Sequence, residues 1–338
     1  MAPNADPTHT TRVRTMRAVV QDRYGDAGVL AVERVEVPVI TENEVLVRVH
    51  AAGIDRGTWH LLTGRPYLMR VIGFGLRAPK NRVPGQDVAG TVVAVGANVT
   101  RFSAGDEVYG VSRGAFAEYA AAREDKLAPK PRNLTFEQAA AVPISAITAL
   151  QALRDAGRVE AGQRVLVIGA SGGVGSYALQ LAKAFGADVT GVASTAKLDL
   201  VRSLGADRVL DYTTDDFADR VHHYDLILDI GGQASVPHLR RALTHRGTLV
   251  IVGGENGGRI TGGFGRQLRA VALSMFVGQR LTMQSTQQRG SDLIALTDLI
   301  ENGQVVPSLE RTYSLEQVPD ALRRIEAGSV RGKIVVSL

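Results

Sequence analysis

A glycine-rich turn between an apolar strand and a helix constrains the fold of this sequence more than any other feature. Residues 164–168 form a short run typical of a buried strand, and Gly169-Ala-Ser-Gly-Gly-Val-Gly175 follows directly. In this setting Gly172 lets a pyrophosphate approach the backbone, and Gly175 lets the helix pack closely on the strand. The free amides and the dipole of the helix N-terminus then face the phosphates. The residues predicted to contact a dinucleotide here are Ala170, Ser171, Gly172, Gly173, Val174 and Gly175.

Strands and helices alternate around this loop. Apolar runs predict buried strands at 164–168, 188–192, 226–229 and 249–252, and helices are predicted between them at 175–185, 197–204 and 236–242. This rhythm is typical of a doubly wound α/β fold, in which helices cover both faces of a parallel sheet. We therefore assign residues 137–279 to a Rossmann dinucleotide-binding domain.

The chain before this unit has a β-rich texture. Short valine-rich runs are separated by turns containing Gly and Pro, a pattern that favours a barrel-like domain; they lie at 16–20, 44–49, 90–95 and 107–111. Thr135 and Gln138 stand at capping-box spacing and predict a helical stretch that extends to Leu153. After residue 279 the pattern is mixed, with helices expected at 291–301 and 318–327 and a strand at 333–336. We expect residues 16–136 and 280–338 to form the second domain.

The end of the second predicted strand indicates which dinucleotide is bound. NAD-binding domains place an acidic residue about 20 residues beyond the glycine loop, where it holds the ribose 2′-hydroxyl. Here the stretch is Val192-Ala-Ser194-Thr-Ala-Lys197, which has no carboxylate, and Asp188 lies at the opposite end of the strand. Hydroxyl and ammonium groups suit a 2′-phosphate, so we predict NADPH rather than NADH. The alternative is that Lys197 is only a solvated helix residue.

Composition excludes several other classes of protein. The 338 residues include no cysteine, which rules out disulfides and cysteine-ligated metals and is compatible with a reducing cytoplasm. Lys and Arg are scattered and the net charge is only +5, so we expect no nucleic-acid partner. No apolar run approaches the ~18 residues of a membrane helix, and we expect a soluble, cytoplasmic protein without a membrane partner. Residues 1–15 are polar, and we expect them to be disordered.

Three further segments carry a family resemblance. They are Pro84-Gly-Gln-Asp-Val-Ala-Gly90, Gly105-Asp-Glu-Val-Tyr-Gly110 and Leu204-Gly-Ala-Asp207. Together with the glycine loop they closely resemble the medium-chain dehydrogenase/reductase superfamily, and the quinone oxidoreductases are the nearest branch. The resemblance extends from about Met16 to the C-terminus. It implies a GroES-like catalytic domain, a partly open β-barrel built from both ends of the chain, and a homodimer or homotetramer.

The same resemblance implies that no metal is bound. Zinc alcohol dehydrogenases hold their catalytic metal at positions that this sequence fills with Asp55, Gln86 and Asp87. A neutral Gln is a poor zinc ligand, and the four cysteines of the structural zinc lobe are absent. We therefore predict a zinc-independent enzyme.

The resemblance also implies contacts to the cofactor outside the glycine loop. Ser194, Lys197 and Tyr212 match residues that lie beside the adenosine 2′-phosphate in similar quinone reductases. Thr148 stands where a threonine often meets the nicotinamide end, and Gly253 matches a backbone contact to the nicotinamide. Ordinary packing is the alternative interpretation of Thr148 and Tyr212.

Substrate residues are expected in the segments 53–60 and 64–67. Tyr67 is the first candidate for a proton source or oxyanion donor, and His60 is the second. Asp55 stands where similar reductases carry Asn, and it either orients the nicotinamide ribose or caps a turn. Trp59 either forms a wall of the substrate site or belongs to the core. Without a metal, hydride transfer to an enone or quinone is favoured, because hydrogen-bond donors can stabilise the charge that develops on oxygen.

The predicted function is therefore that of an NADPH-dependent reductase of a small-molecule quinone or α,β-unsaturated carbonyl compound. Three alternatives stay open. The first is an enoyl reductase that tailors a polyketide-like intermediate, and the second is a metal-free carbonyl reductase or alcohol dehydrogenase. The third is an NADPH-binding redox sensor with little turnover.

Overall fold

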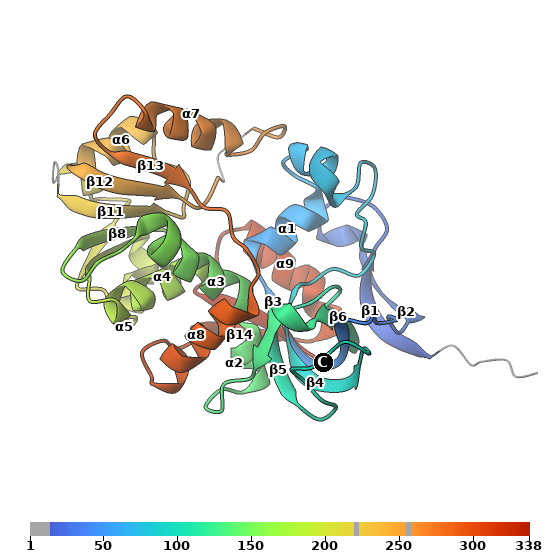
Figure 1. Ribbon diagram of the computed structural model, residues 1–338. Helices are drawn as coiled ribbons and strands as arrows, with labels where there is room; N and C mark the ends of the chain where they lie inside the picture. Colours follow the sequence, from blue (N-terminus) through green and yellow to red (C-terminus); the bar gives the residue numbers. More distant parts are fainter. Residues whose placement is uncertain (1–13, 220–222, 255–257) are drawn as a thin grey trace, which may run out of the picture.

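Two large β-sheets, one in each of two domains, define the architecture of the protein (Figure 1). The computed structural model describes residues 14–219, 223–254 and 258–338. Of the residues that we expect to be disordered, 1–13 lie outside these ranges, whereas Thr15 begins strand β1 (Thr15–Gln21), which corrects that prediction at its end. In the described ranges, no helix is long and apolar enough to cross a membrane.

The Rossmann sheet contains six parallel strands in the order β10-β9-β8-β11-β12-β13. The strands are β8 (Arg164–Ile168), β9 (Asp188–Ala193), β10 (Arg208–Asp211), β11 (Tyr224–Asp229), β12 (Leu243–Ile251) and β13 (Arg280–Met283). The four strands predicted from the sequence overlap β8, β9, β11 and β12. Strand β13 corrects the predicted domain boundary, because it pairs with β12 and so extends this sheet beyond residue 279.

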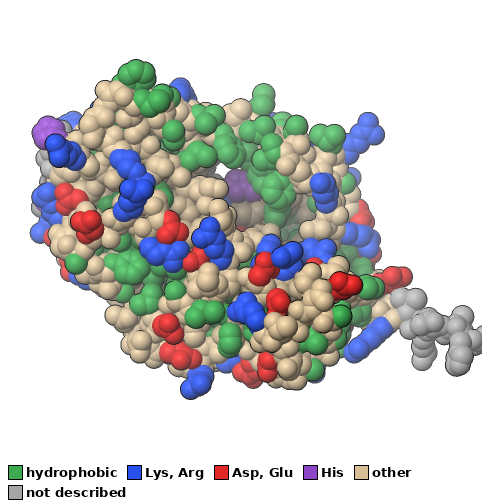
Figure 2. Space-filling view, viewed as in Figure 1, with side chains coloured by type: hydrophobic (Ala, Val, Ile, Leu, Met, Phe, Trp, Pro, Cys, Tyr) green, Lys and Arg blue, Asp and Glu red, His purple; other side chains and the backbone are tan. Residues whose placement is uncertain are grey.

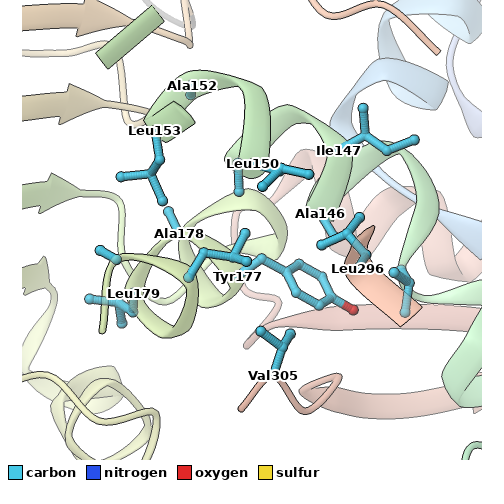
Figure 3. Close-up of a cluster of buried hydrophobic side chains, with 14 of the residues drawn as sticks. Ala146, Ile147, Leu150, Ala152, Leu153, Tyr177, Ala178, Leu179, Leu296 and Val305 are labelled. Atoms are coloured by element: carbon cyan, nitrogen blue, oxygen red, sulfur yellow. The ribbon is translucent and has the colours of Figure 1, made fainter. Parts of the chain in front are cut away.

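Helices cover both faces of this sheet, because successive apolar side chains of a strand point to opposite faces. Val165 and Val167 of β8 join one buried cluster, whereas Leu166 joins another on the opposite face. Figure 3 shows part of the first cluster, in which the side chains of two helices meet. They are α3 (Pro143–Gln151) and α4 (Gly173–Ala184), and the second cluster packs α6 (Val236–Ala242) and α7 (Phe264–Ser274). The buried Tyr177 hydroxyl donates to the Ala141 carbonyl at 3.0 Å.

The catalytic domain is a second sheet, in the order β14-β15-β3-β4-β5-β7, with β6 paired to β3 and a separate hairpin-like pair of β1 and β2. The remaining strands are β2 (Leu30–Glu36), β3 (Glu44–Ile54), β4 (Asp87–Val95), β5 (Glu107–Val111), β6 (Tyr119–Arg123), β7 (Leu127–Pro129), β14 (Leu309–Tyr313) and β15 (Lys333–Ser337). The remaining helices are α1 (Arg56–Thr63), α2 (Phe136–Ala140), α5 (Leu198–Ser203), α8 (Gly290–Glu301) and α9 (Val318–Glu326). The predicted capping box of Thr135 and Gln138 is present at the start of α2.

The two ends of the chain meet in this second sheet. Strand β15, close to the C-terminus, pairs antiparallel with β3, so that Ile334 lies opposite Ile54. The chain therefore leaves the catalytic domain, forms the Rossmann domain and returns to complete the sheet that it left. This arrangement confirms the α/β fold class with a GroES-like domain and a parallel Rossmann sheet.

A buried ion pair joins the two ends to the Rossmann domain. The ammonium group of Lys333 in β15 lies 3.3 Å from the carboxylate of Asp87 in β4, and both side chains are almost completely buried. Lys333 also donates to the Ser145 hydroxyl at 3.1 Å, and the Ile144 N–H donates to Asp87 at 3.0 Å, both at the start of α3. Burial raises the pKa of Asp87 to about 6, with Lys333 acting in the opposite direction.

Removing one partner of this pair should destabilise the protein. We expect Lys333→Met to lower the free energy of unfolding by about 3–5 kcal/mol above pH 7, because it leaves an ionised Asp87 buried without a counter-charge. Urea unfolding measures the effect. Lys183→Met removes an exposed ion pair with Asp207 and should cost only about 0–1 kcal/mol. The double variant Asp87→Asn/Lys333→Met should recover part of the loss, and a Lys333→Met protein as stable as the Lys183→Met control would contradict this role.

Candidate active site

The predicted phosphate loop joins β8 to α4 at the carboxyl edge of the Rossmann sheet. Gly169 has a φ of 85°, a conformation that favours glycine. The N–H groups of Gly169 and Ala170 donate to the Val192 carbonyl at 3.2 and 3.0 Å, which fixes the loop against β9. Gly172 is the N-cap residue of α4. The amides of the first turn of α4 have no carbonyl of their own helix to bind, as an anion site at a helix N-terminus requires.

The loop glycines differ in how closely protein atoms surround them. A Cβ atom added to Gly175 would lie 2.1 Å from the Gly169 carbonyl oxygen, so only glycine allows this close packing of helix and loop. At Gly172 the nearest protein atom would be 3.5 Å away, an ordinary contact distance. Protein packing therefore requires glycine at 175 but not at 172. The open space at Gly172 fits the approach of a pyrophosphate.

The catalytic domain contacts this loop directly. The Gly332 N–H donates to the Ser171 carbonyl at 2.8 Å. A Cβ atom added to Gly173 would lie 3.1 Å from Cδ of Lys333, so the buried ion pair described above borders the loop. The position of the predicted phosphate site thus depends on both domains.

The residues predicted for the adenosine end come together at the carboxyl ends of β9 and β10. The N–H of Tyr212 donates to the Ala193 carbonyl at 3.1 Å, which places Tyr212 beside Ser194. The ammonium group of Lys197 donates to the carbonyls of Gly328 and Val330, at 2.9 Å each. Burial lowers the pKa of Lys197. Lys197 is therefore not a freely solvated helix residue, because it links β9 to the segment before β15.

One acidic residue near the adenosine end was not predicted from the sequence. Asp211 ends β10, opposite Ala193 of β9. Its two carboxylate oxygens accept hydrogen bonds from Thr195 and Thr213, which lower its pKa. Its place in β10, a strand that was not predicted, explains why it was overlooked.

The residues predicted for the nicotinamide end follow the other half of the sheet. The Gly253 N–H donates to the Asp229 carbonyl at 3.1 Å, and a Cβ atom at Gly253 would lie 2.0 Å from the Ile230 carbonyl oxygen. The Thr148 hydroxyl donates to the Ile144 carbonyl at 2.7 Å and accepts from Thr286 at 3.1 Å. Thr148 therefore lies near the carboxyl end of β13, and part of its hydrogen bonding is local to α3.

A cavity of about 480 Å³ lies between the two domains at the carboxyl ends of β12 and β13. Figure 2 shows a hollow between the two lobes with hydrophobic side chains along its walls. The catalytic domain contributes residues from α1 and the segment after it, and the Rossmann domain contributes residues that follow β12 and β13. The lining residues used below are Arg56, Trp59, His60, Arg65, Met69, Arg259, Phe264, Gln267, Met283, Gln284 and Ser285.

His60 and Trp59 both line this cavity. Nδ1 of His60 lies 2.8 Å from the Arg65 carbonyl oxygen, which can only accept, so Nδ1 carries a proton. In the neutral ring Nε2 is then an acceptor, and donation from Nε2 requires the charged imidazolium form. The Arg56 guanidinium lies 4.3 Å from the centre of the Trp59 ring. Trp59 also packs against the core of the catalytic domain, so it belongs to both the wall and the core.

Asp55 and Tyr67 are placed differently from the main expectation. Asp55 is the N-cap of α1, where its carboxylate accepts from the N–H and hydroxyl of Thr58 at 2.8 and 3.1 Å. This is the capping alternative of the prediction. The Tyr67 ring lies against the Arg70 guanidinium at 4.7 Å and does not line the cavity between the domains. The first candidate for the proton donor is therefore not brought to the cavity.

Several lining residues were missed because no local motif marks them. Met283 ends β13, and Gln284 and Ser285 follow it; the strand's sequence Arg-Leu-Thr-Met contains only two apolar residues. Arg65 and Arg259 come from two loops that are far apart in the sequence. Recognising a further parallel strand after α7 would have indicated Met283, Gln284 and Ser285. The carboxyl end of such a strand must lie at the same edge of the sheet as the other strand ends.

The chemistry of the site fits a cofactor with phosphate groups. The loop amides, the space at Gly172 and the cation Lys197 fit a phosphorylated dinucleotide. Within residues 14–219, 223–254 and 258–338, no group of three His, Asp or Glu side chains is arranged to hold a metal ion.

Two family models match the chain. The alcohol dehydrogenase GroES-like domain matches residues 41–132, and a domain described as zinc-binding dehydrogenase matches residues 204–336. The fold and the site thus define a two-domain, dinucleotide-dependent oxidoreductase. The chain belongs to the medium-chain dehydrogenase/reductase superfamily and, within it, to the quinone oxidoreductase-like branch, which confirms the resemblance noted in the sequence.

Several relatives of the chain are named as reductases or oxidoreductases. The 2-methylene-furan-3-one reductase of Solanum lycopersicum is 35% identical, over 95% of this chain and 79% of that protein. The NADPH-dependent alkenal/one oxidoreductase, chloroplastic, of Arabidopsis thaliana is 36% identical, over 96% of this chain and 80% of that protein. The structure of the quinone oxidoreductase from Coxiella burnetii has a TM-score of 0.85 and 27% identity, covering 96% of this chain and all of that one.

Two glycine substitutions should separate binding from folding at the phosphate loop. We expect Gly172→Ala to fold with a near-unchanged melting temperature but to bind NADPH roughly tenfold more weakly, because the methyl group occupies space needed by the pyrophosphate. Gly175→Ala should lower the melting temperature, because its Cβ would overlap the Gly169 carbonyl. Fluorescence titration with NADPH and thermal unfolding measure the two effects. Wild-type affinity in Gly172→Ala would show that the pyrophosphate does not approach this residue.

Proposed function

We propose that the protein reduces a quinone or an α,β-unsaturated carbonyl compound with NADPH and without zinc. The observation that carries the proposal is the cavity between α1 and the carboxyl ends of β12 and β13, beside the predicted nicotinamide contact Gly253. The names of relatives at 35% and 36% identity support reduction of conjugated carbonyl compounds. The non-enzymatic alternative, a redox sensor, has no such support.

The residues of this chain would divide the work between the two domains. Gly172 and the first turn of α4 hold the pyrophosphate, while Gly253 and Thr148 bound the nicotinamide end. A dinucleotide held in this way would supply the hydride that reduces the β-carbon of an enone and would itself be oxidised, and the α-carbon would take a proton from solvent. Negative charge then develops on the carbonyl oxygen, where a hydrogen-bond donor lowers the barrier. His60 in its charged form, Gln284 and Ser285 are among the donors that line the cavity, and Trp59 offers a flat wall.

The test is the consumption of NADPH at 340 nm with a panel of enones, quinones, enoyl thioesters and saturated aldehydes. We expect turnover with enones or quinones at least tenfold faster than with saturated aldehydes, because a conjugated acceptor needs no Lewis acid. Zinc added at equimolar concentration, or removed by a chelator, should leave the rate unchanged. The variant Gly172→Ala, as a matched control, should raise KM for NADPH. Tight binding of NADPH with no acceptor reduced would reject the proposal in favour of a sensor, and a preference for aldehydes would favour the carbonyl reductase alternative.

We further propose that NADPH is preferred over NADH. Tyr212 bonds to Ala193, the residue before Ser194, and Lys197 follows Ser194 by three residues, so a 2′-phosphate bound at the ends of β9 and β10 would be near hydroxyl groups and a cation. The nearby carboxylate of Asp211 accepts hydrogen bonds from Thr195 and Thr213 and ends β10, whereas the acidic residue of NAD-binding domains stands at the end of the second strand, here β9.

The preference depends on Lys197. We expect Lys197→Gln to raise KM for NADPH roughly tenfold and to change KM for NADH less than twofold, because only NADPH carries the 2′-phosphate. Steady-state kinetics with both cofactors measure the ratio. Lys183→Gln, on an exposed pair with Asp207, is the control and should change neither constant. Equal loss with both cofactors would assign Lys197 a structural role through the carbonyls of Gly328 and Val330.

We also propose that the protein forms a homodimer or homotetramer and acts in a reducing cytoplasm. Strand β13 is an edge strand of the Rossmann sheet, bonded on one side to β12. The neighbouring Met275 and Phe276 are 76% and 82% exposed. A second copy of the chain that continued the sheet at β13 would cover them.

A further inference from the structure

Acidic residues are absent from two segments that border the cavity. Residues 56–86 and 258–291 contain 11 of the 39 Lys and Arg residues of the chain and none of its 34 Asp and Glu residues. Outside these segments, 28 basic residues are outnumbered by 34 acidic ones. Although Lys and Arg residues are scattered along the sequence, Asp and Glu residues are unevenly distributed. The net positive charge of the protein comes entirely from the two segments.

The two segments meet at the mouth of the cavity. The N–H groups of Tyr67 and Leu68 donate to the carbonyls of Arg259 and Ile260, at 2.8 and 2.9 Å. Pro66 packs against Gly262, where an added Cβ would come within 2.8 Å of the proline ring. These contacts cross from the catalytic domain to the Rossmann domain. They bring the neighbouring residues Arg65 and Arg259, which both line the cavity, to the same opening.

Most other cations of these segments are committed to protein groups. Arg82 pairs with Asp22 and Glu33, and Arg266 pairs with Asp229. Arg70 donates to the carbonyls of Thr63 and Gly64.

Arg65 and Arg259 differ from these residues. Both are exposed, and neither side chain makes a hydrogen bond or ion pair with any residue that the structure describes. No carboxylate lines the cavity within the described ranges. Two guanidinium groups thus border the cavity without a counter-charge from any residue that the structure describes.

The phosphates of the cofactor do not account for these two arginines. The 2′-phosphate site at β9 and the pyrophosphate site at β8 lie three and two strands away from β12 in the sheet order. Adjacent strands are separated by about 4.8 Å, so these sites are about 14 and 10 Å from the end of β12. The arginines border the cavity at β12 and β13, on the side where a substrate would enter.

We infer that the substrate is a conjugated carbonyl compound that carries an anionic group, a carboxylate or a phosphate, held by Arg65 and Arg259. This inference rests on the proposed reductase function and specifies its substrate class. Arginine binds both anions through paired N–H donors. The apolar part of the substrate lies along Trp59 and Met283, with its β-carbon toward the nicotinamide. A bound NADPH would be oxidised as its hydride reduces the β-carbon, the α-carbon would take a proton from solvent, and the anionic group would be unchanged.

Two matched substrate pairs test the inference. One pair is a conjugated enone with a terminal carboxylate and its methyl ester. The other is crotonyl coenzyme A and S-crotonyl-N-acetylcysteamine, which has the same thioester without phosphates. We expect kcat/KM to be at least tenfold higher for the anionic member of one pair, and we expect the difference to come from KM. The kcat/KM of the anionic substrate should fall as the salt concentration rises. Preference within the first pair assigns a carboxylate, and preference within the second assigns a phosphate.

The double variant Arg65→Gln/Arg259→Gln should remove this preference. We expect kcat/KM for the preferred anionic substrate to fall at least tenfold, with kcat and the rate for its neutral partner changed less than twofold. Arg77→Gln is the matched control, because Arg77 is an exposed arginine of the same segment that does not line the cavity. An unchanged melting temperature shows that the variants are folded.

The outcomes distinguish this inference from the function on which it rests. Equal kcat/KM within both pairs, or an equal loss for charged and neutral substrates in the double variant, would overturn the inference and leave the reductase function intact. NADPH binding without reduction of any of the four compounds, or of the earlier panel, would overturn both.

Discussion

The buried pair of Asp87 and Lys333 is the interaction on which the geometry of the site depends. Two charges that are almost fully removed from water need each other and further hydrogen bonds, and here the bonds come from Ser145 and Ile144. These partners lie on β4, β15 and α3, so the pair requires both ends of the chain and the Rossmann domain. Lys333 also packs beside Gly173 of the phosphate loop. The pairing of the two chain ends in the catalytic domain and the shape of the predicted cofactor site are therefore coupled.

The sheet order explains why the site forms where it does. From the middle of the sheet, the chain adds strands β8, β9 and β10 toward one edge and strands β11, β12 and β13 toward the other. Ligands of doubly wound sheets bind outside the carboxyl ends of the strands at the point where the order divides, here between β8 and β11. The predicted contacts in the phosphate loop, at Ser194 and Tyr212, and at Gly253 all follow strand ends on this edge. The catalytic domain then supplies what the sheet cannot, a second wall formed by α1. Hydrogen bonds between Tyr67 and Arg259 and between Leu68 and Ile260 join the two walls.

The sequence predicted the features that depend on local patterns. Strands β8 and β5 have the predicted bounds, since both are apolar runs that end at a glycine or a polar turn. The loop glycines and the capping box of α2 were also predicted, because each requires particular residues at fixed spacing. Strands β10 and β13 were missed because their short sequences mix Arg, Asp and Thr with few apolar residues. Capping by Asp55 was one of the two roles that the sequence allowed, since Asp is a preferred residue at a helix N-cap.

The rest of the site depends on contacts between distant segments. Asp87 and Lys333 are 246 residues apart in the chain, and no local pattern relates them. Tyr67 was chosen by resemblance, but its ring turns to Arg70 because the segment after α1 is fixed by its bonds to Arg259 and Ile260. The same bonds bring Arg65 and Arg259 to one opening. In a cavity that no described carboxylate lines, these charges favour an anionic substrate. The contacts that join the two walls therefore also set the charge of the opening through which a substrate enters.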